Sequence, residues 1–290
     1  MKISLPRCAL FHRAGLASLR AGLAAALLVT LPVAAQQEEP APIQDNSFLI
    51  EEAYNQEPGV VQHINAFSRG DDSGDWGYTF TQEWPVRSQR HQLSYTVPWQ
   101  RLEDSPDGGS GVGDVAVNYR LQLLGSGETP VAFSPRLSLL LPTGDEEEGR
   151  GAGAAGLQVN LPLSVVLADR FVTHVNLGAT HTPNARSSAG DEADVTAYNF
   201  GQSFIWLARP KLNLMLELAY NSGEEITGPG ATEESDSFFI SPGLRWAWDL
   251  PSGLQIVPGV AVPLGAGPSS GERQVFFYLS FEHPFLRTGG

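Results

Sequence analysis

The stretch that decides the fold runs from Asp114 to Leu123 and reads DVAVNYRLQL. Every second residue in the run from position 115 is apolar, which is the period of a β-strand whose two faces meet different surroundings. One face carries Val115, Val117, Tyr119, Leu121 and Leu123, and the other carries Asp114, Ala116, Asn118, Arg120 and Gln122. In water such an apolar face must pack on a second sheet, whereas in a membrane barrel it faces lipid and the polar face lines the lumen.

The same alternation recurs along the chain, for example over residues 157–165, 211–220 and 274–282. About twelve such segments follow residue 35, and several of them, such as 113–124 and 237–250, have ten residues or more. Globular strands usually have about five or six residues, whereas a tilted membrane strand needs about nine to eleven. Strand length therefore favours a membrane barrel over a soluble sandwich.

Short and long connections alternate between these segments. The short ones are residues 87–89, 125–130, 168–170, 208–210 and 251–253. Most of the others are long, rich in Gly, Ser, Asp and Glu, and include the acidic runs 103–107, 145–148, 224–225 and 233–234. Bacterial transmembrane barrels sort their connections in this way, with short periplasmic turns and long extracellular loops. The sequence predicts an all-β fold, a single closed antiparallel transmembrane barrel of about twelve strands.

The aromatic residues support a membrane barrel, whereas the prolines argue against it. The six tryptophans and Phe285 fall towards strand ends, as interfacial aromatic girdles do. Proline lacks the donor of a sheet ladder, and a closed barrel has no free edge to accommodate it. We therefore expect strand ends or bulges at Pro98, Pro135, Pro162, Pro242 and Pro258.

The N-terminus has the pattern of a cleaved secretory signal. Lys2, Arg7, Arg13 and Arg20 precede an apolar stretch, residues 21–33, that is too short to span a bilayer. Small residues at 33–35 then suggest cleavage before Gln36. The expected organisation is a signal peptide (1–35), a periplasmic leader or plug segment (36–58) and the outer-membrane barrel (59–290).

Composition excludes several classes. The one cysteine, Cys8, would leave with the signal, so neither a disulfide nor a thiolate metal site is expected. Residues 36–290 hold 14 basic and 32 acidic residues, a net charge near −18, which argues against nucleic acid as a partner. After the signal there is no run of eighteen apolar residues, so a helical membrane protein is excluded.

Residues 48–59 form neither a clear strand nor a low-complexity tail. Ile50, Ala53, Tyr54 and Glu57 have the spacing of a short helix, which Pro58-Gly59 would end. This segment could fold into the lumen or lie at the periplasmic mouth, and the alternative is a mobile leader.

Charged residues in the middle of predicted strands are candidate lumen residues. Arg120 and Arg136 flank the turn 125–130 almost symmetrically, so hairpin pairing would place them close together. Two such cations would attract small anions. Alternatively, they pair with lumen carboxylates such as Glu83, Glu217 or Glu282 and brace the barrel. The residues expected to set the lumen charge are Arg120, Arg136, Glu217, Arg245 and Glu83.

Other motifs carry little chemistry. A GxGxxG match at Gly151, Gly153 and Gly156 precedes strand-like sequence and not a helix, so a loop tip is the better interpretation. The acidic run 145–148 lacks the alternating ligand spacing of a calcium loop. His91 and Ser94 are three residues apart and point to opposite faces of one strand. His174 and His181 have no serine at even spacing in their own strand, although a cross-strand pair remains open.

Three stretches resemble a known family: GVGDVAVNYR at 111–120, PRLSLLLPTGD at 135–145 and QVNLPLS at 158–164. They are similar to the outer-membrane barrels named after the meta-pathway of phenol degradation, which are described as candidate transporters. Residues 48–63 and TQEWPV at 81–86 also fit that family. The resemblance implies uptake of small aromatic or other hydrophobic compounds. The residues after Phe285 depart from the terminal aromatic that the barrel-assembly machinery favours.

The sequence therefore predicts an exported outer-membrane channel of a Gram-negative bacterium for passive uptake of small solutes, aromatic, hydrophobic or anionic. The expected partners are outer-membrane lipid and lipopolysaccharide, the solute and the barrel-assembly machinery, with no cofactor, no metal and no enzymatic activity. Two alternatives stay open. One is an outer-membrane lipid hydrolase, which needs a Ser-His pair facing outward, and the other is a secreted soluble β-sandwich that binds cell-wall material.

Overall fold

The computed structural model describes residues 43, 47–71, 73–103 and 107–285. The chain divides into two units, residues 1–38 and 39–290. The first unit, which contains the expected signal peptide, lies outside the described residues, and so does most of the expected leader before Ser47. The barrel belongs to the second unit.

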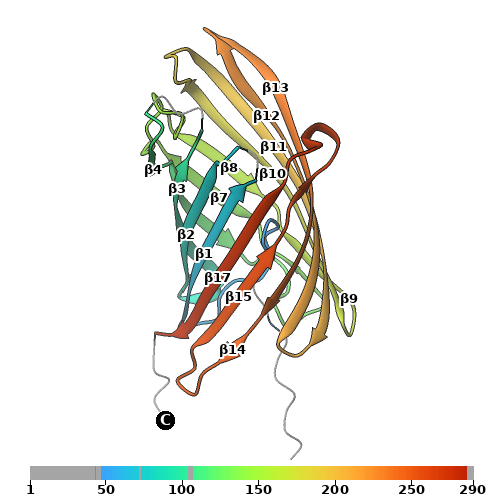
Figure 1. Ribbon diagram of the computed structural model, residues 1–290. Helices are drawn as coiled ribbons and strands as arrows, with labels where there is room; N and C mark the ends of the chain where they lie inside the picture. The colour runs from blue at the N-terminus through green and yellow to red at the C-terminus, as the bar shows by residue number, and fades with distance from the viewer. Residues whose placement is uncertain (1–42, 44–46, 72, 104–106, 286–290) are drawn as a thin grey trace, which may run out of the picture. The chain divides into compact units, whose positions relative to one another are not determined.

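Twelve antiparallel strand positions form a closed barrel, some of them filled by two shorter strands in sequence (Figure 1). In chain order they are β1 (Val60–Gly70), β2 (Trp76–Val86), β3 (Ser88–Arg101), β4 (Ser110–Val112) with β5 (Val115–Leu121), β6 (Val131–Phe133) with β7 (Arg136–Leu141), β8 (Gly156–Asn160) with β9 (Leu163–Ala168), β10 (Phe171–Arg186), β11 (Glu192–Arg209), β12 (Leu212–Gly228), β13 (Ala231–Trp246) with β14 (Trp248–Asp249), β15 (Gln255–Ala261) with β16 (Leu264–Gly265), and β17 (Gln274–Pro284). The first and last strands close the barrel, because β1 pairs with β17 along its whole length, from Val60 opposite Pro284 to Gly70 opposite Gln274. The predicted fold class is confirmed.

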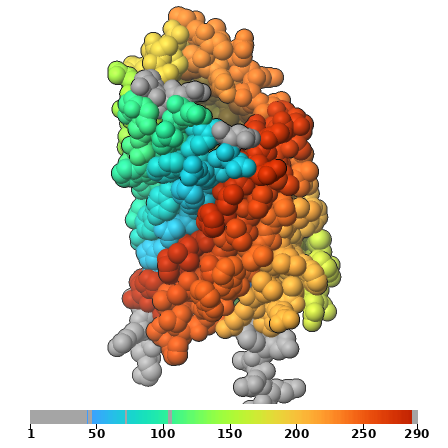
Figure 2. All heavy atoms as spheres, viewed as in Figure 1, coloured from blue at the N-terminus to red at the C-terminus, as the bar shows by residue number. Residues whose placement is uncertain are grey.

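The apolar faces point outward and the polar faces point inward. Leu157, Val159, Leu214 and Leu216 are 37 to 56% exposed. Their inward neighbours Asn160 and Glu217 are 5% and 0% exposed. A sandwich would bury those leucines between two sheets, so the alternative of a soluble sandwich does not fit. Figure 2 shows the outer face over β1, β2, β15 and β17 as a continuous surface of side-chain atoms.

The prolines agree only in part with the prediction of strand ends and bulges. Pro135 and Pro162 lie in the breaks between β6 and β7 and between β8 and β9. Pro98 lies inside β3 beside a one-residue register shift between Thr96 and Trp99, which is a bulge as predicted. Pro242 and Pro258 lie inside β13 and β15 without a shift of register, so for these two the prediction is wrong. In each case the neighbouring strand is interrupted beside the proline, at residues 113–114, 262–263 and 247 respectively, so the missing N–H faces a gap in the ladder.

The short turns lie where the sequence predicts them, for example residues 169–170 between β9 and β10 and residues 210–211 between β11 and β12. One predicted long loop is wrong. The pairing of β12 with β13 continues to Gly228 opposite Ala231, so Glu224, Glu225, Glu233 and Glu234 lie on a projecting hairpin. Pairing between the two strands satisfies the backbone groups of this segment. The side chains of Glu225, Glu233 and Glu234 stay exposed, whereas Glu224 is half-buried and accepts hydrogen bonds from the N–H of Thr196 and the hydroxyl of Thr232.

The loop between β7 and β8 is held by one arginine. The side chain of Arg150 is 7% exposed and lies 3.1 Å from Asp107, 3.6 Å from Asp145 and 4.0 Å from Glu148. Two residues of the acidic run 145–148 are therefore paired with Arg150. Among the described residues, the only helical segment is the 3₁₀ turn η1 (Gly267–Ser269), and no helix has the length and hydropathy to cross a bilayer.

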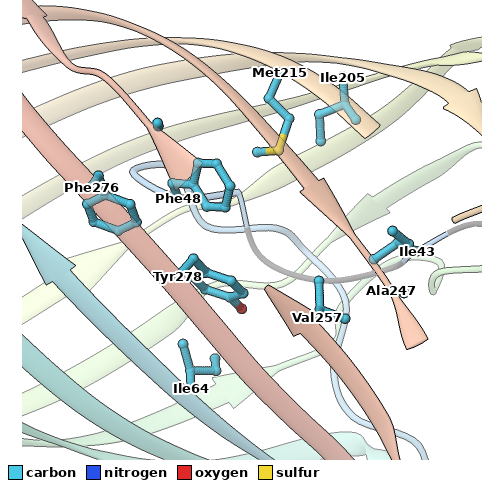
Figure 3. Packing of buried hydrophobic residues seen from close by; sticks show 10 residues of the cluster. Ile43, Phe48, Ile64, Ile205, Met215, Ala247, Val257, Phe276 and Tyr278 are labelled. Atoms are coloured by element: carbon cyan, nitrogen blue, oxygen red, sulfur yellow. The ribbon is translucent and has the colours of Figure 1, made fainter. Parts of the chain in front are cut away.

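The main cluster of buried apolar residues lies inside the barrel and is drawn in Figure 3. It gathers around Phe48, which precedes the first strand, and includes Phe276 and Tyr278 of β17 and Met215 of β12. The core of this protein thus forms where an N-terminal segment meets one side of the lumen wall.

Candidate functional site: a lumen occupied by residues 47–58

Residues 47–58, here called the strap, lie inside the barrel without helix or strand structure (Figure 1, blue). The predicted helix over this segment is wrong. A helix would use the strap's N–H groups internally. Here lumen side chains accept hydrogen bonds from the N–H groups of Leu49, Ile50, Glu51, Ala53, Asn55 and Gln56.

These acceptors follow one another around the barrel. Glu217 of β12 accepts from Leu49 at 3.0 Å and from Ile50 at 3.3 Å. The next acceptors are Asn176 of β10 at 2.6 Å, Ser164 of β9 at 2.8 Å, Gln122 after β5 at 2.9 Å and Gln92 of β3 at 2.7 Å. Asn176 and Gln122 also donate to strap carbonyls, at 2.7 and 2.8 Å. The polar face of the wall thus serves as the partner of the strap's main chain.

Arg120 makes the densest set of strap contacts. Its guanidinium donates to the carbonyl of Glu52 at 3.1 Å, the carbonyl of Tyr54 at 2.7 Å and the side chain of Asn55 at 2.9 Å. It also forms an ion pair with Glu51 at 3.1 Å, and Glu83 lies 3.6 Å away. The side chain is 2% exposed, so these groups replace its water.

Glu51 links the two arginines that the sequence singles out. Arg120 and Arg136 are directly opposite in the pairing of β5 with β7, as predicted. Glu51 lies 3.1 Å from each of them and accepts a hydrogen bond from Asn160 at 2.7 Å. Burial by itself would raise the pKa of Glu51, but Arg136 and Arg120 outweigh that effect, so its pKa lies below the ordinary value. A strap carboxylate therefore compensates the charge of two wall arginines.

All five candidate lumen residues face the interior, although they do not form one cluster. Glu83 bonds to Gln92 at 2.8 Å and lies near Arg120, which fits the bracing alternative. Glu217 holds the strap main chain, and Arg245 is 3.5 Å from the carbonyl of Ile43. The carboxylates that lie closest to Arg120 and Arg136 in the described part of the chain are those of Glu51 and Glu83. Their role in selectivity stays a prediction.

Glu51 and the amide side chains that hold the strap were not among the residues predicted from the sequence. Gln92, Gln122, Asn160 and Asn176 are all 8% exposed or less. The sequence does show amide side chains on the polar faces of the strands. Their partners could not be predicted from it, because it did not decide whether residues 47–58 lie inside the lumen.

A serine and a histidine do meet across two strands. Ser164 of β9 is opposite His174 of β10, and its hydroxyl lies 2.7 Å from Nδ1 of the imidazole. Both side chains face the interior and are 1% exposed, and the N–H of Ala53 donates to the same hydroxyl. The lipid hydrolase alternative needs such a pair on the lipid face, so this pair does not provide it.

The strap separates two cavities. One, of about 510 Å³, lies towards the projecting hairpin and is lined by Glu51, Arg136 and several amide side chains. The other, of about 670 Å³, lies towards the end where β1 begins and β17 ends, and its lining includes Glu52, Tyr54 and Asn55. Adjacent strap residues thus face opposite ends of the lumen.

A closed barrel with apolar side chains outside and a polar interior defines this chain as a transmembrane β-barrel protein. Within that class, it belongs to the family described as "Putative MetA-pathway of phenol degradation", whose profile matches residues 56–262. The family expected from the sequence is confirmed.

Two solved structures show the same fold. The COG4313 outer membrane channel from Pseudomonas putida F1 has a TM-score of 0.61 at 13% identity, covering 83% of this chain and 99% of that chain. The NanC porin has a TM-score of 0.50 at 5% identity, covering 76% of this chain and 98% of that chain. No curated protein matches the sequence significantly. At these identities the likeness concerns the fold alone.

Proposed function

We propose that this protein is a non-enzymatic outer-membrane channel for passive diffusion of small solutes, and that the strap is its gate. The observation that carries the proposal is the position of the strap between the cavity of about 510 Å³ and the cavity of about 670 Å³. Every described contact that holds it is noncovalent, and most are hydrogen bonds of its main chain to wall side chains. Such contacts can be exchanged for water when the strap leaves.

The gate also sets the charge of the lumen. While the strap is seated, the carboxylate of Glu51 lies between Arg120 and Arg136. Displacement would carry Glu51 and Glu52 away from the wall and leave both arginines facing the open lumen. Fixed cations in a narrow, low-dielectric passage raise the local concentration of anions. The open channel is therefore proposed to prefer anions.

The test compares the full chain with a variant that lacks residues 47–58, in planar bilayers. Removal of the strap is expected to raise the single-channel conductance and, in a KCl gradient, to shift the reversal potential towards chloride. Arg136→Gln in the strap-deleted background serves as the matched control, and it should reduce the chloride preference while the conductance stays high. Equal conductance with and without the strap would contradict the gate.

Localisation and partners follow from the same proposal. The barrel fold matches outer-membrane proteins, and we propose that residues 1–35 direct export and are then removed. Lipopolysaccharide and the barrel-assembly machinery stay predicted partners. Fractionation with detergent tests this, because a chain recovered in the aqueous periplasmic fraction would not be the proposed channel.

A further inference from the structure

The side chain of Phe48 occupies a pocket in the lumen wall (Figure 3). Its ring centroid lies 5.5 Å from that of Phe276 and 5.4 Å from that of Tyr278, both on β17. Tilted aromatic rings at this separation attract each other beyond simple burial. We call this pocket the ring seat.

Two glycines make room for the ring on neighbouring strands. A Cβ atom at Gly243 of β13 would lie 2.8 Å from Cε2 of Phe48, and a Cβ atom at Gly259 of β15 would overlap the ring. Gly243 is opposite Ala261, and Gly259 is opposite Arg245, so the two glycines lie close together on the inner face. At these two positions the wall has no side chain, and the ring of Phe48 occupies the space that a side chain would fill.

The ring seat is built from strands, whereas its occupant is not. Phe48 belongs to the strap, and the next two residues are held by the carboxylate of Glu217. When the strap leaves, β13, β15 and β17 keep their pairing, so the ring seat stays formed and open to the lumen. Glu217 then loses its strap donors.

Unpaired polar groups flank the ring seat. On the inner face of β13, Ser241 precedes Gly243 by two residues, and Asn213 is opposite Arg245 on β12. Both side chains are 0% exposed, and neither the hydroxyl of Ser241 nor either amide atom of Asn213 has a hydrogen-bond partner among the residues that the structure describes. Buried polar groups without partners are rare and destabilising, and a ligand that bonds them gains affinity.

We propose that the ring seat is a binding site for a small solute with one aromatic ring and a hydroxyl group, and that this solute competes with Phe48 for the seat. The ring replaces that of Phe48 between the glycines and the aromatic side chains. The hydroxyl bonds to the polar groups beside the seat, where Glu217, Ser241 and Asn213 offer acceptors and donors. The inference rests on the proposed function, because competition at the seat would release the gate.

The experiment reads strap release directly. Cys8 is the only cysteine of the chain and precedes residue 36, so Ser47→Cys places a single thiol beside Phe48 in the barrel. Ser47 is 3% exposed, so a maleimide reaches this thiol only when the strap end is released. Phenol is the probe, and cyclohexanol, which has the hydroxyl without the aromatic ring, is its matched control. Phenol is expected to speed labelling roughly tenfold, the order of effect of exchanging one buried ring, and cyclohexanol is expected to have little effect.

A second variant separates the ring seat from a general effect of phenol on the micelle. Gly243→Val fills the seat, so labelling should be fast without phenol and unchanged by it. Gly243→Ala is the milder version if the valine variant does not fold, as judged by heat modifiability in detergent. Equal effects of phenol and cyclohexanol, or a phenol effect that persists in a folded Gly243 variant, would overturn the inference. The conductance of the strap-deleted channel does not depend on this result. The experiments can therefore contradict the proposed gate and the proposed binding site separately.

Discussion

The two ends of the strap are held by different kinds of contact. Residues 49–56 are bound mainly through their main chain, by wall side chains whose hydrogen bonds do not depend on the strap sequence. Phe48 is bound through its side chain, by shape and aromatic contact. Main-chain recognition fixes the path of the strap, and the side chains of Phe48 and Glu51 fix its position along that path. The two ends should therefore respond differently to mutation.

The largest expected effect comes from Arg120→Met. This change removes the hydrogen bonds to Glu52, Tyr54 and Asn55 and leaves the carboxylates of Glu51 and Glu83 near an apolar side chain. Removing one member of a buried ion pair costs about 3–5 kcal/mol. A single thiol introduced by Ala53→Cys, at a position that is 0% exposed, should then react quickly with maleimide.

Arg136→Met is the matched control for that variant. The side chain of Arg136 is 21% exposed and shares only Glu51 with the strap among the contacts of the described residues. Labelling at position 53 should rise less than in Arg120→Met. The same rate in both variants would mean that the strap is held by the net charge of the wall and not by the geometry around Arg120.

Gln122→Leu separates the two ends of the strap. Gln122 accepts from the N–H of Asn55 at 2.9 Å and donates to the carbonyl of Ala53 at 2.8 Å, so leucine leaves two buried strap groups without partners. The cost is about 1–3 kcal/mol for each unsatisfied group. Labelling at Ala53→Cys should accelerate, while labelling at Ser47→Cys changes little because the ring seat is intact.

Gln158→Leu is the corresponding control, because Gln158 bonds to Arg136 and Thr180 and not to the strap among the described residues. It should leave both labelling rates near those of the parent protein. If Gln122→Leu released both ends equally, the strap would move as one rigid unit and the comparison between its ends would be wrong.

The barrel could be predicted from the sequence far better than the strap. The period-two pattern of residues 114–123 depends on a contrast between lipid and lumen that each strand meets separately, so it is visible in a single segment. The positions of the prolines within the strands were harder to predict. Pro98, for example, is tolerated because the neighbouring strand is interrupted beside it. That compensation lies in another part of the chain and cannot be read beside the proline.

The position of the strap depends on pairs that are distant in sequence. The spacing of Ile50, Ala53, Tyr54 and Glu57 fits a helix, and local propensity supports it. The structure departs from it because Glu217, 167 positions after Ile50, offers the N–H groups a buried acceptor. Tertiary contacts of this kind override a weak local preference. Charged lumen residues could be predicted from strand faces, but their partner Glu51 could not.

A smaller effect is expected from pH, and it should appear at one end only. Arg120 and Arg136 hold the pKa of Glu51 below its ordinary value of 4.5, so its ion pairs stabilise the seated strap above that value. This contribution is lost as the pH falls through the lowered pKa. Labelling at position 53 should therefore stay slow as the pH drops to about 4.5 and accelerate at more acidic values, as measured with 4,4′-dithiodipyridine, a disulfide that remains reactive towards thiols in acid. Glu51→Gln should give a faster rate with no such acceleration, and a parent rate independent of pH would argue against a structural role for the Glu51 charge.

The smallest effect is expected for Lys211→Met, away from the strap. The ammonium of Lys211 lies 2.6 Å from Asp249, but the two side chains are 41% and 44% exposed. Ion pairs as exposed as this contribute only about 0–1 kcal/mol. Neither labelling rate should change, and conductance should match that of the parent. This variant is a control for a general destabilisation of the barrel. If labelling at positions 47 and 53 became faster in Lys211→Met as well as in Arg120→Met, the thiols would report barrel stability and not strap contacts.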